Sequence, residues 1–258
     1  MNTVLCEASD GVGRIILNRP DRMNSITVEL GRELERAILD LGAAPDVNVV
    51  LIRGGGGNFC AGGDFHEVQC LRSDGPEALL GLFVAFRRAC DAIASIEIPV
   101  VAAVEGVAMA GGFELMQAAD IVLVSDDARI ADNHINFGMI PGGGSTQRLA
   151  RLVGRQQALG MLLSGDRISG VEALRRGLAY RSFAQTDFDD NVERFVATLA
   201  QRPRAAVSAI KRLVYTSLEQ PAAGLDAEID AVVAHISGDA GARGVAAFAQ
   251  KGAVNDNG

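Results

Sequence analysis

Apolar runs of two different lengths alternate along the first part of the chain. Short runs, several of them β-branched, predict buried strands at residues 12–17, 47–52, 100–104, 121–124 and 128–131. Longer stretches, with apolar residues recurring every three or four positions, predict helices at residues 27–41, 78–96 and about 113–118. Strands that alternate with helices in this way predict an α/β fold.

The last third of the chain has a different pattern. From residue 145 onward it reads as helical almost to the end, with a break at Gln201-Arg202-Pro203. We therefore expect a core domain at residues 1–200 and a separate helical region at residues 201–258. A monomer could not easily bury all the apolar positions of the second region, which predicts self-association. These positions include Val207, Ile210, Leu213, Val214 and Leu218.

Two segments repeat the order of strand, glycine turn and helix. Residues 49–52 lead to Ala61-Gly62-Gly63-Asp64, and residues 100–104 lead to Ala110-Gly111-Gly112-Phe113-Glu114. The repetition suggests stacked strand–helix turns. Chance similarity in a sequence rich in glycine and alanine is the alternative.

Composition narrows the class of protein. The 258 residues suffice for one large domain with a helical appendage, and with 48% hydrophobic residues and no Trp the core must be aliphatic. The net charge of −8 argues against a nucleic-acid partner. The longest apolar stretch, residues 98–113, is interrupted by Glu105 and is too short to cross a membrane.

Cysteine and histidine usage bears on metals and compartment. The four cysteines form no Cys-x-x-Cys pair, and the three histidines complete no familiar zinc pattern, so we expect no metal site. The N-terminus lacks the charged and apolar segments of a signal peptide. These features favour a reducing, cytoplasmic location.

Gly63 and Gly111 follow the two repeated strands, where backbone amides can approach a ligand closely. Two such N–H groups could stabilise the oxyanion that forms when a thioester becomes an enolate. A phosphate-binding P-loop is excluded because no Gly-Lys-Ser/Thr ending is present, and Gln147 excludes a nucleophile elbow. Ordinary turn glycines remain the alternative.

Glu114 and His134 are the candidate proton carriers. Glu114 lies three residues after Gly111, so it would stand in the first helical turn near any ligand of that amide. A carboxylate there could also serve only the helix dipole. His134 follows Asp132-Asn133 and precedes an apolar stretch, where a structural, hydrogen-bonded histidine is the alternative.

Four ordered motifs closely resemble the crotonase (enoyl-CoA hydratase/isomerase) superfamily, over roughly residues 10–250. They are Leu17-Asn18-Arg19-Pro20-Asp21-Arg22-Met23-Asn24-Ser25, Phe59-Cys60-Ala61-Gly62-Gly63-Asp64, Ala110-Gly111-Gly112-Phe113-Glu114-Leu115 and Ile140-Pro141-Gly142-Gly143-Gly144-Ser145-Thr146-Gln147-Arg148-Leu149. The resemblance implies a crotonase-like spiral of repeated ββα units with a C-terminal helical oligomerisation region. It also implies homotrimers, commonly paired as hexamers, and an acyl-CoA substrate without a separate cofactor.

The resemblance also implies roles for single residues. Gly63 and Gly111 would donate to the oxyanion, and Glu114 would activate water. Arg22 would lie near the CoA phosphates, where a guanidinium suits an anion. The CoA path would be lined by Ala61, Asp64, Phe65 and His66.

Two departures from the family pattern affect these roles. Asn133-His134 stands where hydratases carry Pro and a second glutamate, the residue that handles the proton at the α carbon. The usual basic, Phe-containing tail is reduced to Phe248-Ala249-Gln250-Lys251-Gly252. Contacts of that tail with CoA are therefore not expected to follow the family.

A hydratase-type lyase acting on 2-enoyl-CoA is the leading interpretation. Glu114 would act on water at the β carbon, and His134 would serve the α carbon, since an imidazole exchanges protons near neutrality. An acyl-CoA isomerase or hydrolase on the same fold is the alternative. A non-catalytic acyl-CoA-binding paralogue is the third interpretation, because one glutamate is missing.

Overall fold

The computed structural model describes residues 2–219. The chain divides into two units after Gln201. Of the second unit the structure describes helix α9 (Arg204–Glu219). The expected tail, residues 248–252, and the side chain of Leu218 lie outside the described residues.

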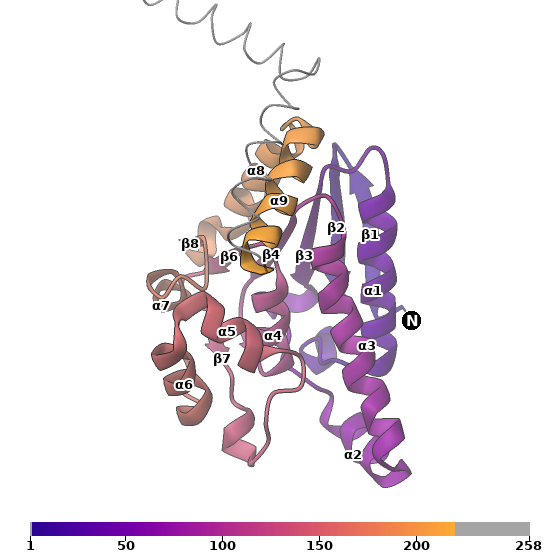
Figure 1. Cartoon of the computed structure of the whole chain (residues 1–258), viewed down its shortest axis with the longest axis vertical. Coiled ribbons are helices and arrows are strands. Elements are labelled where there is room, and N and C mark those ends of the chain that lie inside the picture. Colours follow the sequence, from indigo (N-terminus) through magenta and orange to yellow (C-terminus); the bar gives the residue numbers. More distant parts are fainter. Residues whose placement is uncertain (1, 220–258) are drawn as a thin grey trace, which may run out of the picture. The chain divides into compact units, whose positions relative to one another are not determined.

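A six-stranded sheet forms the centre of the first unit (Figure 1). The spatial order of its strands is β1 (Val4–Ser9), β2 (Val12–Leu17), β3 (Val49–Gly54), β4 (Val100–Val104), β6 (Ile121–Ser125) and β8 (Arg181–Phe183). β1 runs antiparallel to β2, and every other neighbouring pair is parallel. A second, parallel sheet pairs β5 (Val107–Met109) with β7 (Arg129–Ala131).

Helices connect these strands. They are α1 (Val28–Ala43), α2 (Phe65–Asp74), α3 (Pro76–Ser95), α4 (Gly111–Ala118), α5 (Ser145–Val153), α6 (Arg155–Ser164), α7 (Gly170–Arg175) and α8 (Phe188–Ala200). Short 3₁₀ turns are η1 (Pro20–Arg22), η2 (Gly55–Gly57), η3 (His134–Phe137) and η4 (Gln185–Asp187).

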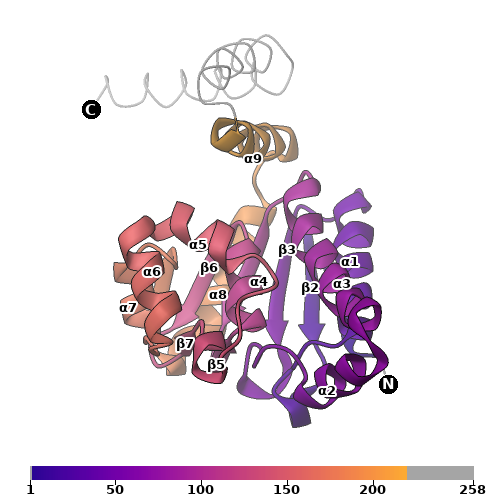
Figure 2. The same cartoon turned by 60° about the horizontal axis from the view of Figure 1, so that its bottom comes forward.

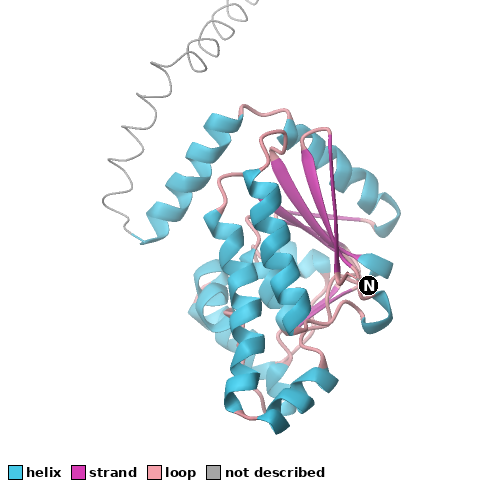
Figure 3. Cartoon of the chain, turned by 90° about the vertical axis from the view of Figure 1, so that its right-hand side faces the viewer, coloured by secondary structure: helices cyan, strands magenta, loops and turns pink. Residues whose placement is uncertain are grey.

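The large sheet is covered on both faces (Figures 2 and 3). Because side chains alternate along a strand, Val50 and Ile52 of β3 face one core and Val49 and Leu51 face the other. The first core is completed by α1, α3 and α4, and the second by α8. Burial on both faces explains why the central strands are continuous apolar runs.

The chain winds through the two sheets as a spiral. β4 and β6 lie in the large sheet, and the strand that follows each of them, β5 or β7, lies in the small one. After β3 the same step is a single bridge, in which Cys60 pairs parallel to Ala108. Each turn then continues into helices, which gives stacked ββα units and confirms the predicted mixed α/β fold and the internal repeat.

The predicted strands and helices are found in the structure, but four further elements were not predicted: α2 and the strands β1, β5 and β8. α2 has no buried residue and therefore no apolar face, and β5 is three residues long within a longer apolar stretch. The expectation of an all-helical pattern after residue 145 is wrong, because the short, half-buried β8 adds an edge to the sheet. β1 was not predicted: Val4 is its single buried residue, so no apolar alternation marks it. No helix within residues 2–219 is both long and apolar enough to cross a membrane.

Substitution of Gly112 tests the close contact between successive turns of the spiral. A Cβ on Gly112 would overlap the backbone carbonyl of Cys60, whereas one on Gly81 in α3 would meet no atom within 4 Å. We expect Gly112→Ala to lower the free energy of unfolding by about 1–3 kcal/mol through overpacking. Gly81→Ala should raise it by about 0.4–1 kcal/mol. Urea unfolding measures both, and equal stabilities of the two variants would contradict the contact.

Candidate active site

The two repeated glycine turns lie against each other. The N–H of Cys60 donates to the Val107 carbonyl at 2.9 Å, and the N–H of Met109 donates to the Cys60 carbonyl at 3.0 Å. These bonds bring Gly62 next to Gly111, so closely that a Cβ on Gly62 would lie 3.3 Å from the Gly111 nitrogen. The spiral therefore places the two predicted oxyanion glycines at one site.

The secondary structure around the two amide groups uses neither of them. Ile26 pairs with the residues on either side of Gly63, donating to the Gly62 carbonyl at 2.7 Å and accepting from the Asp64 N–H at 2.8 Å. The alternation of a strand turns the Gly63 N–H to the other side. Gly111 begins α4, where an N–H has no helical acceptor. Within the described residues, neither N–H has a hydrogen-bond acceptor.

Ala110 turns the chain sharply from β5 into α4. Its φ of 50° and ψ of −118° lie in a region that residues with a Cβ rarely adopt. The Ala110 N–H donates to the Ala131 carbonyl at 3.0 Å, which ties this turn to the end of β7. Such local strain is typical of functional sites, where it fixes the direction of a neighbouring group, here the Gly111 N–H.

Glu114 stands in the first turn of α4 and is 2% exposed. Its Oε1 accepts hydrogen bonds from the N–H groups of Gly143, at 2.7 Å, and Ser145, at 3.1 Å. Burial raises the pKa of Glu114 above 4.5, although these two donors and the nearby His134 act to lower it. A carboxylate with a raised pKa is a better general base near neutrality.

The loop that carries these two donors is held from three sides. The Arg148 Nη1 donates to the Gly143 carbonyl at 2.6 Å. The Gln117 Nε2 donates to the buried Ser145 Oγ at 2.7 Å. A side chain at Gly143 would overlap the ring of Phe86 in α3. The position of Glu114 therefore depends on residues from α3, α4 and α5.

His134 is paired with a buried acid that directly follows β7. Its Nδ1 lies 2.7 Å from the Oδ1 of Asp132, whose side chain is 1% exposed. Burial by itself would lower the pKa of His134, but the hydrogen bond and charge of Asp132, together with the charge of Glu114, raise it above 6.5. His134 thus has a buried acid as its partner and interacts electrostatically with Glu114, and its role as a proton carrier stays a prediction.

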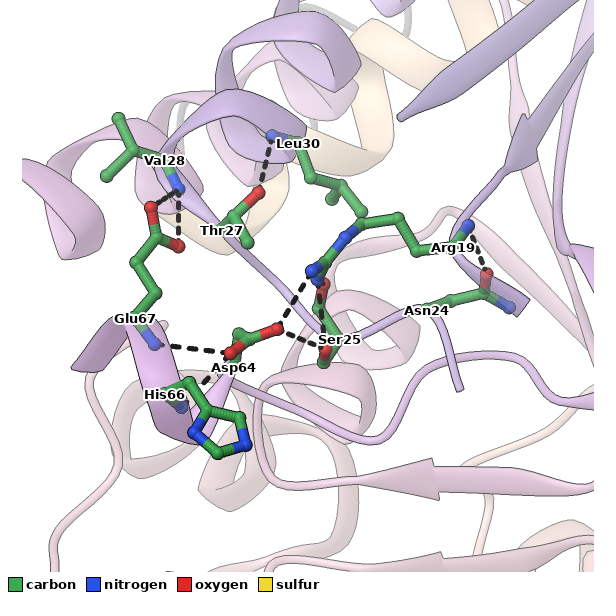
Figure 4. Close-up of polar contacts among 9 residues, drawn as sticks. All are labelled: Arg19, Asn24, Ser25, Thr27, Val28, Leu30, Asp64, His66 and Glu67. Carbon is green, nitrogen blue, oxygen red and sulfur yellow. Dashed lines mark hydrogen bonds and ion pairs between the residues drawn. The ribbon is translucent and has the colours of Figure 1, made fainter. Parts of the chain in front are cut away.

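Asp64 belongs to a polar network that joins two segments far apart in sequence (Figure 4). Its carboxylate accepts from Arg19 at 2.9 Å and from Ser25 at 3.1 Å, and it caps the first N–H groups of α2. These hydrogen bonds lower the pKa of Asp64 against the effect of burial. Glu67 of α2 accepts in turn from the Val28 N–H at the start of α1. The observed contacts of Asp64 are structural, and a contact with CoA stays a prediction.

The other predicted binding residues lie around this network. Phe65 and His66 open α2 and are exposed, with their rings edge to face at a centroid distance of 6.2 Å. Ala61 is half-buried and packs on the small sheet. Arg22 is exposed, and its side chain has no hydrogen bond or ion pair with the rest of the described chain. It is therefore open to an anion.

The sequence did not reveal which residues hold the two candidate proton carriers, Glu114 and His134. Asp132 was noted as a neighbour of His134, and the Asp-x-His spacing was the signal that it could be a partner. Gly143 and Ser145 lie in one of the four motifs that resemble the family. That resemblance did not indicate that the N–H groups of these two residues bind Glu114. Across residues 2–219 no cluster of three or more metal-binding side chains is found.

Similarity to known proteins agrees with this fold. The family model described as "Enoyl-CoA hydratase/isomerase" matches residues 7–256. The chain is 33% identical to a probable enoyl-CoA hydratase, echA8, of Mycobacterium leprae, over 97% of this chain and 96% of the relative. It is 28% identical to a peroxisomal Delta(3,5)-Delta(2,4)-dienoyl-CoA isomerase of Arabidopsis thaliana, covering 81% of this chain and 78% of that protein.

Solved structures give the same result for the fold. The crystal structure of an enoyl-CoA hydratase from Polaromonas sp. JS666 superposes with a TM-score of 0.91 at 28% identity, covering 96% of this chain and 97% of that chain. The ββα spiral, which brings the two glycine turns together and buries Glu114, is the crotonase fold. The chain belongs to the enoyl-CoA hydratase/isomerase family.

Two substitutions at Gly111 distinguish the effect of losing its N–H from the effect of adding a Cβ. Proline is accepted at the first position of a helix but removes the N–H, whereas alanine keeps it. Both changes bring the same Cβ to within 2.6 Å of the flexible end of Ile26. We expect Gly111→Pro to turn over an enoyl-CoA about 10²–10³-fold more slowly than Gly111→Ala. Equal rates in two folded variants would remove this N–H from the mechanism.

Proposed function

We propose that the protein is a hydratase-type acyl-CoA enzyme that adds water across the 2,3 double bond of an enoyl-CoA, or removes it in reverse. The observation that carries this proposal is the buried Glu114 carboxylate in the first turn of the helix that Gly111 begins. The Gly63 turn lies against Gly111, and the protonatable His134 interacts electrostatically with Glu114. This set contains a base, an oxyanion site and an acid. The family relatives named as hydratases support it.

Each of these groups has its own role in the proposed hydration. Glu114 takes a proton from water as the water oxygen bonds to C3, and the double-bond electrons move toward the thioester oxygen. The Gly63 and Gly111 N–H groups stabilise the resulting enolate oxyanion. His134 gives its proton to C2, which restores the thioester carbonyl. Transfer of the proton from Glu114 to His134, directly or through solvent, then resets the site, and the atoms of one water molecule have been added.

The same site suggests how CoA is held. Arg22, at the exposed η1 turn, would pair with a CoA phosphate, because a guanidinium matches phosphate geometry. Ala61, Asp64, Phe65 and His66 would border the path of the pantetheine arm. CoA is part of the substrate in this proposal, and no separate cofactor is required. A cytoplasmic location also stays a prediction.

A double-bond shift within an acyl-CoA is the second candidate. It is favoured by His134, because an imidazole with a pKa raised above 6.5 can both give and take a proton near neutrality. The isomerase from Arabidopsis thaliana supports it as a relative. Hydration adds the mass of water and isomerisation does not, so mass spectrometry of the products distinguishes them.

A test of the proposal is the change Glu114→Gln. The Gln carbonyl can still accept the N–H groups of Gly143 and Ser145, but the amide cannot take a proton. We expect hydration of but-2-enoyl-CoA to fall by about 10²–10⁴-fold, while binding of the thioester changes little. Stopped assays give the rate, and calorimetric titration with a saturated acyl-CoA gives the binding.

The wild-type protein supplies the companion measurement. It is incubated with a panel of enoyl-CoA and 3-hydroxyacyl-CoA thioesters, and water gain, water loss and free CoA are followed by mass spectrometry. Water gain or loss supports the hydratase. Release of free CoA indicates a hydrolase, and binding without turnover indicates a non-catalytic paralogue; either result would overturn the proposal.

We also predict that the protein assembles as a homotrimer or as a hexamer of two trimers. Supporting this, Ile210 and Val214 of α9 are 62% and 54% exposed, although both are large and apolar. Light scattering coupled to size exclusion should give a mass of three or six chains of 27.0 kDa. A monodisperse monomer at micromolar concentration would contradict the prediction.

A further inference from the structure

We propose that Asp132 is a positioning residue, which holds the His134 ring by Nδ1 and leaves Nε2 as the nitrogen that exchanges a proton with substrate. This inference rests on the proposed function for the role of the proton, but the pairing itself is independent of it. Asp132 itself is not assigned to contact the substrate. Its influence on the reaction passes through the imidazole.

The side chain of Asp132 has one hydrogen-bond partner among the described residues. Its side chain is 1% exposed, and its Oδ1 lies 2.7 Å from the His134 Nδ1. Its Oδ2 has no hydrogen-bond partner among the described residues. Asp132 also caps no helix, because Asn133 is the N-cap of η3 and supplies no side-chain bond. Since a buried carboxylate is costly without a partner, the imidazole is the contact that accounts for it.

The backbone of Asp132 is connected to the proposed oxyanion site through the residue before it. Ala131, the residue before Asp132, accepts the Ala110 N–H at 3.0 Å, and Ala110 precedes Gly111. Pairing of β5 with β7 therefore fixes the backbone of Asp132 relative to the Gly111 amide. A ring held by Asp132 is in turn fixed relative to the place where the enolate forms. This arrangement gives the proton donor a defined position.

The charged groups around His134 also favour this role for Asp132. Two charged groups act on His134: Asp132 at the end of β7, and Glu114 on α4. Arg148 of α5, the nearby cation, binds the Gly143 carbonyl and Asp91 instead. One imidazolium between two carboxylates carries the same net charge of −1 as a pair of glutamates that share one proton. Asp132 thus compensates for the positive charge that histidine brings to this position.

The state of the ring can be measured directly in the wild-type protein. The chain has three histidines, His66, His134 and His235, so ¹⁵N-histidine spectra are simple to assign with a His134→Gln variant. We expect His134 to titrate above 6.5. When it becomes neutral, the proton should remain on Nδ1. A pKa below this value, or a neutral ring protonated on Nε2, would overturn the proposal without any change to Asp132.

The variant Asp132→Asn tests the charge. The Asn Oδ1 can still accept from Nδ1, so the ring keeps its partner while the charge is removed. We expect the His134 pKa to fall by about 1 unit or more. Asp127→Asn is the matched control, because Asp127 is exposed in the turn before β7 and bonds to Ser125. An unchanged His134 titration in Asp132→Asn, or an equal fall in Asp127→Asn, would overturn the proposal.

The pH profile of hydration gives the functional readout. His134 acts as the acid, so the alkaline limb of kcat/KM follows its pKa and should move to lower pH in Asp132→Asn. The charge of Asp132 also raises the pKa of Glu114, so the acid limb should move in the same direction. If both limbs of the kcat/KM profile stay in place although the His134 pKa falls, Asp132 does not act on the reaction through this proton.

The proposed function and this inference can fail separately. Suppose that the wild type turns over no acyl-CoA, but His134 titrates as expected in Asp132→Asn and in Asp127→Asn. The hydratase proposal is then wrong, and the pairing of Asp132 with His134 stands. If Asp132→Asn does not fold, Asp132→Glu keeps the charge: with the bond to Nδ1 retained, the His134 pKa should stay above 6.5. A lower value there would overturn the proposal.

Discussion

The site depends on one close backbone contact, that of Gly112 with the carbonyl of Cys60. A Cβ on Gly112 would overlap that carbonyl, so the second turn of the spiral can pack on the first only if residue 112 has no side chain. The hydrogen bonds of Cys60 with β5 fix the same contact in register. Because the two glycine turns follow directly from these residues, their amide groups converge from separate parts of the chain.

Backbone amides have two different tasks in this site. Those of Gly63 and Gly111 have no acceptor among the described residues and face a developing negative charge in the proposed reaction. Those of Gly143 and Ser145 are already used, because they bind the Glu114 carboxylate. This second pair binds Oε1 and offsets part of the cost of burying Glu114. In the proposed reaction the other oxygen, Oε2, takes the proton of water. Burial therefore raises the pKa of Glu114, while the two amides fix its position and act to lower that pKa.

Replacement of a glutamate by histidine changes the charge of a site unless another group compensates. Here Asp132 supplies the missing negative charge from the strand end next to the oxyanion turn. In the proposed reaction, His134 held by Asp132 handles the proton that a second carboxylic acid handles in the family pattern. The departure from that pattern therefore does not by itself argue against catalysis.

The sequence by itself determined the α/β class, most of the strands and helices, and Glu114 and His134 as candidates, because periodicity and glycine position are local properties. It did not reveal β1 or β8, since exposed or half-buried edge strands carry little apolar pattern. It also did not reveal the three-residue β5 or α2, which has no buried residue. Only the tertiary structure decided that Asp132 pairs with His134 and that the amides of residues 143 and 145 bind Glu114. These contacts depend on how separate turns of the spiral stack, and residue spacing along the chain does not determine that stacking.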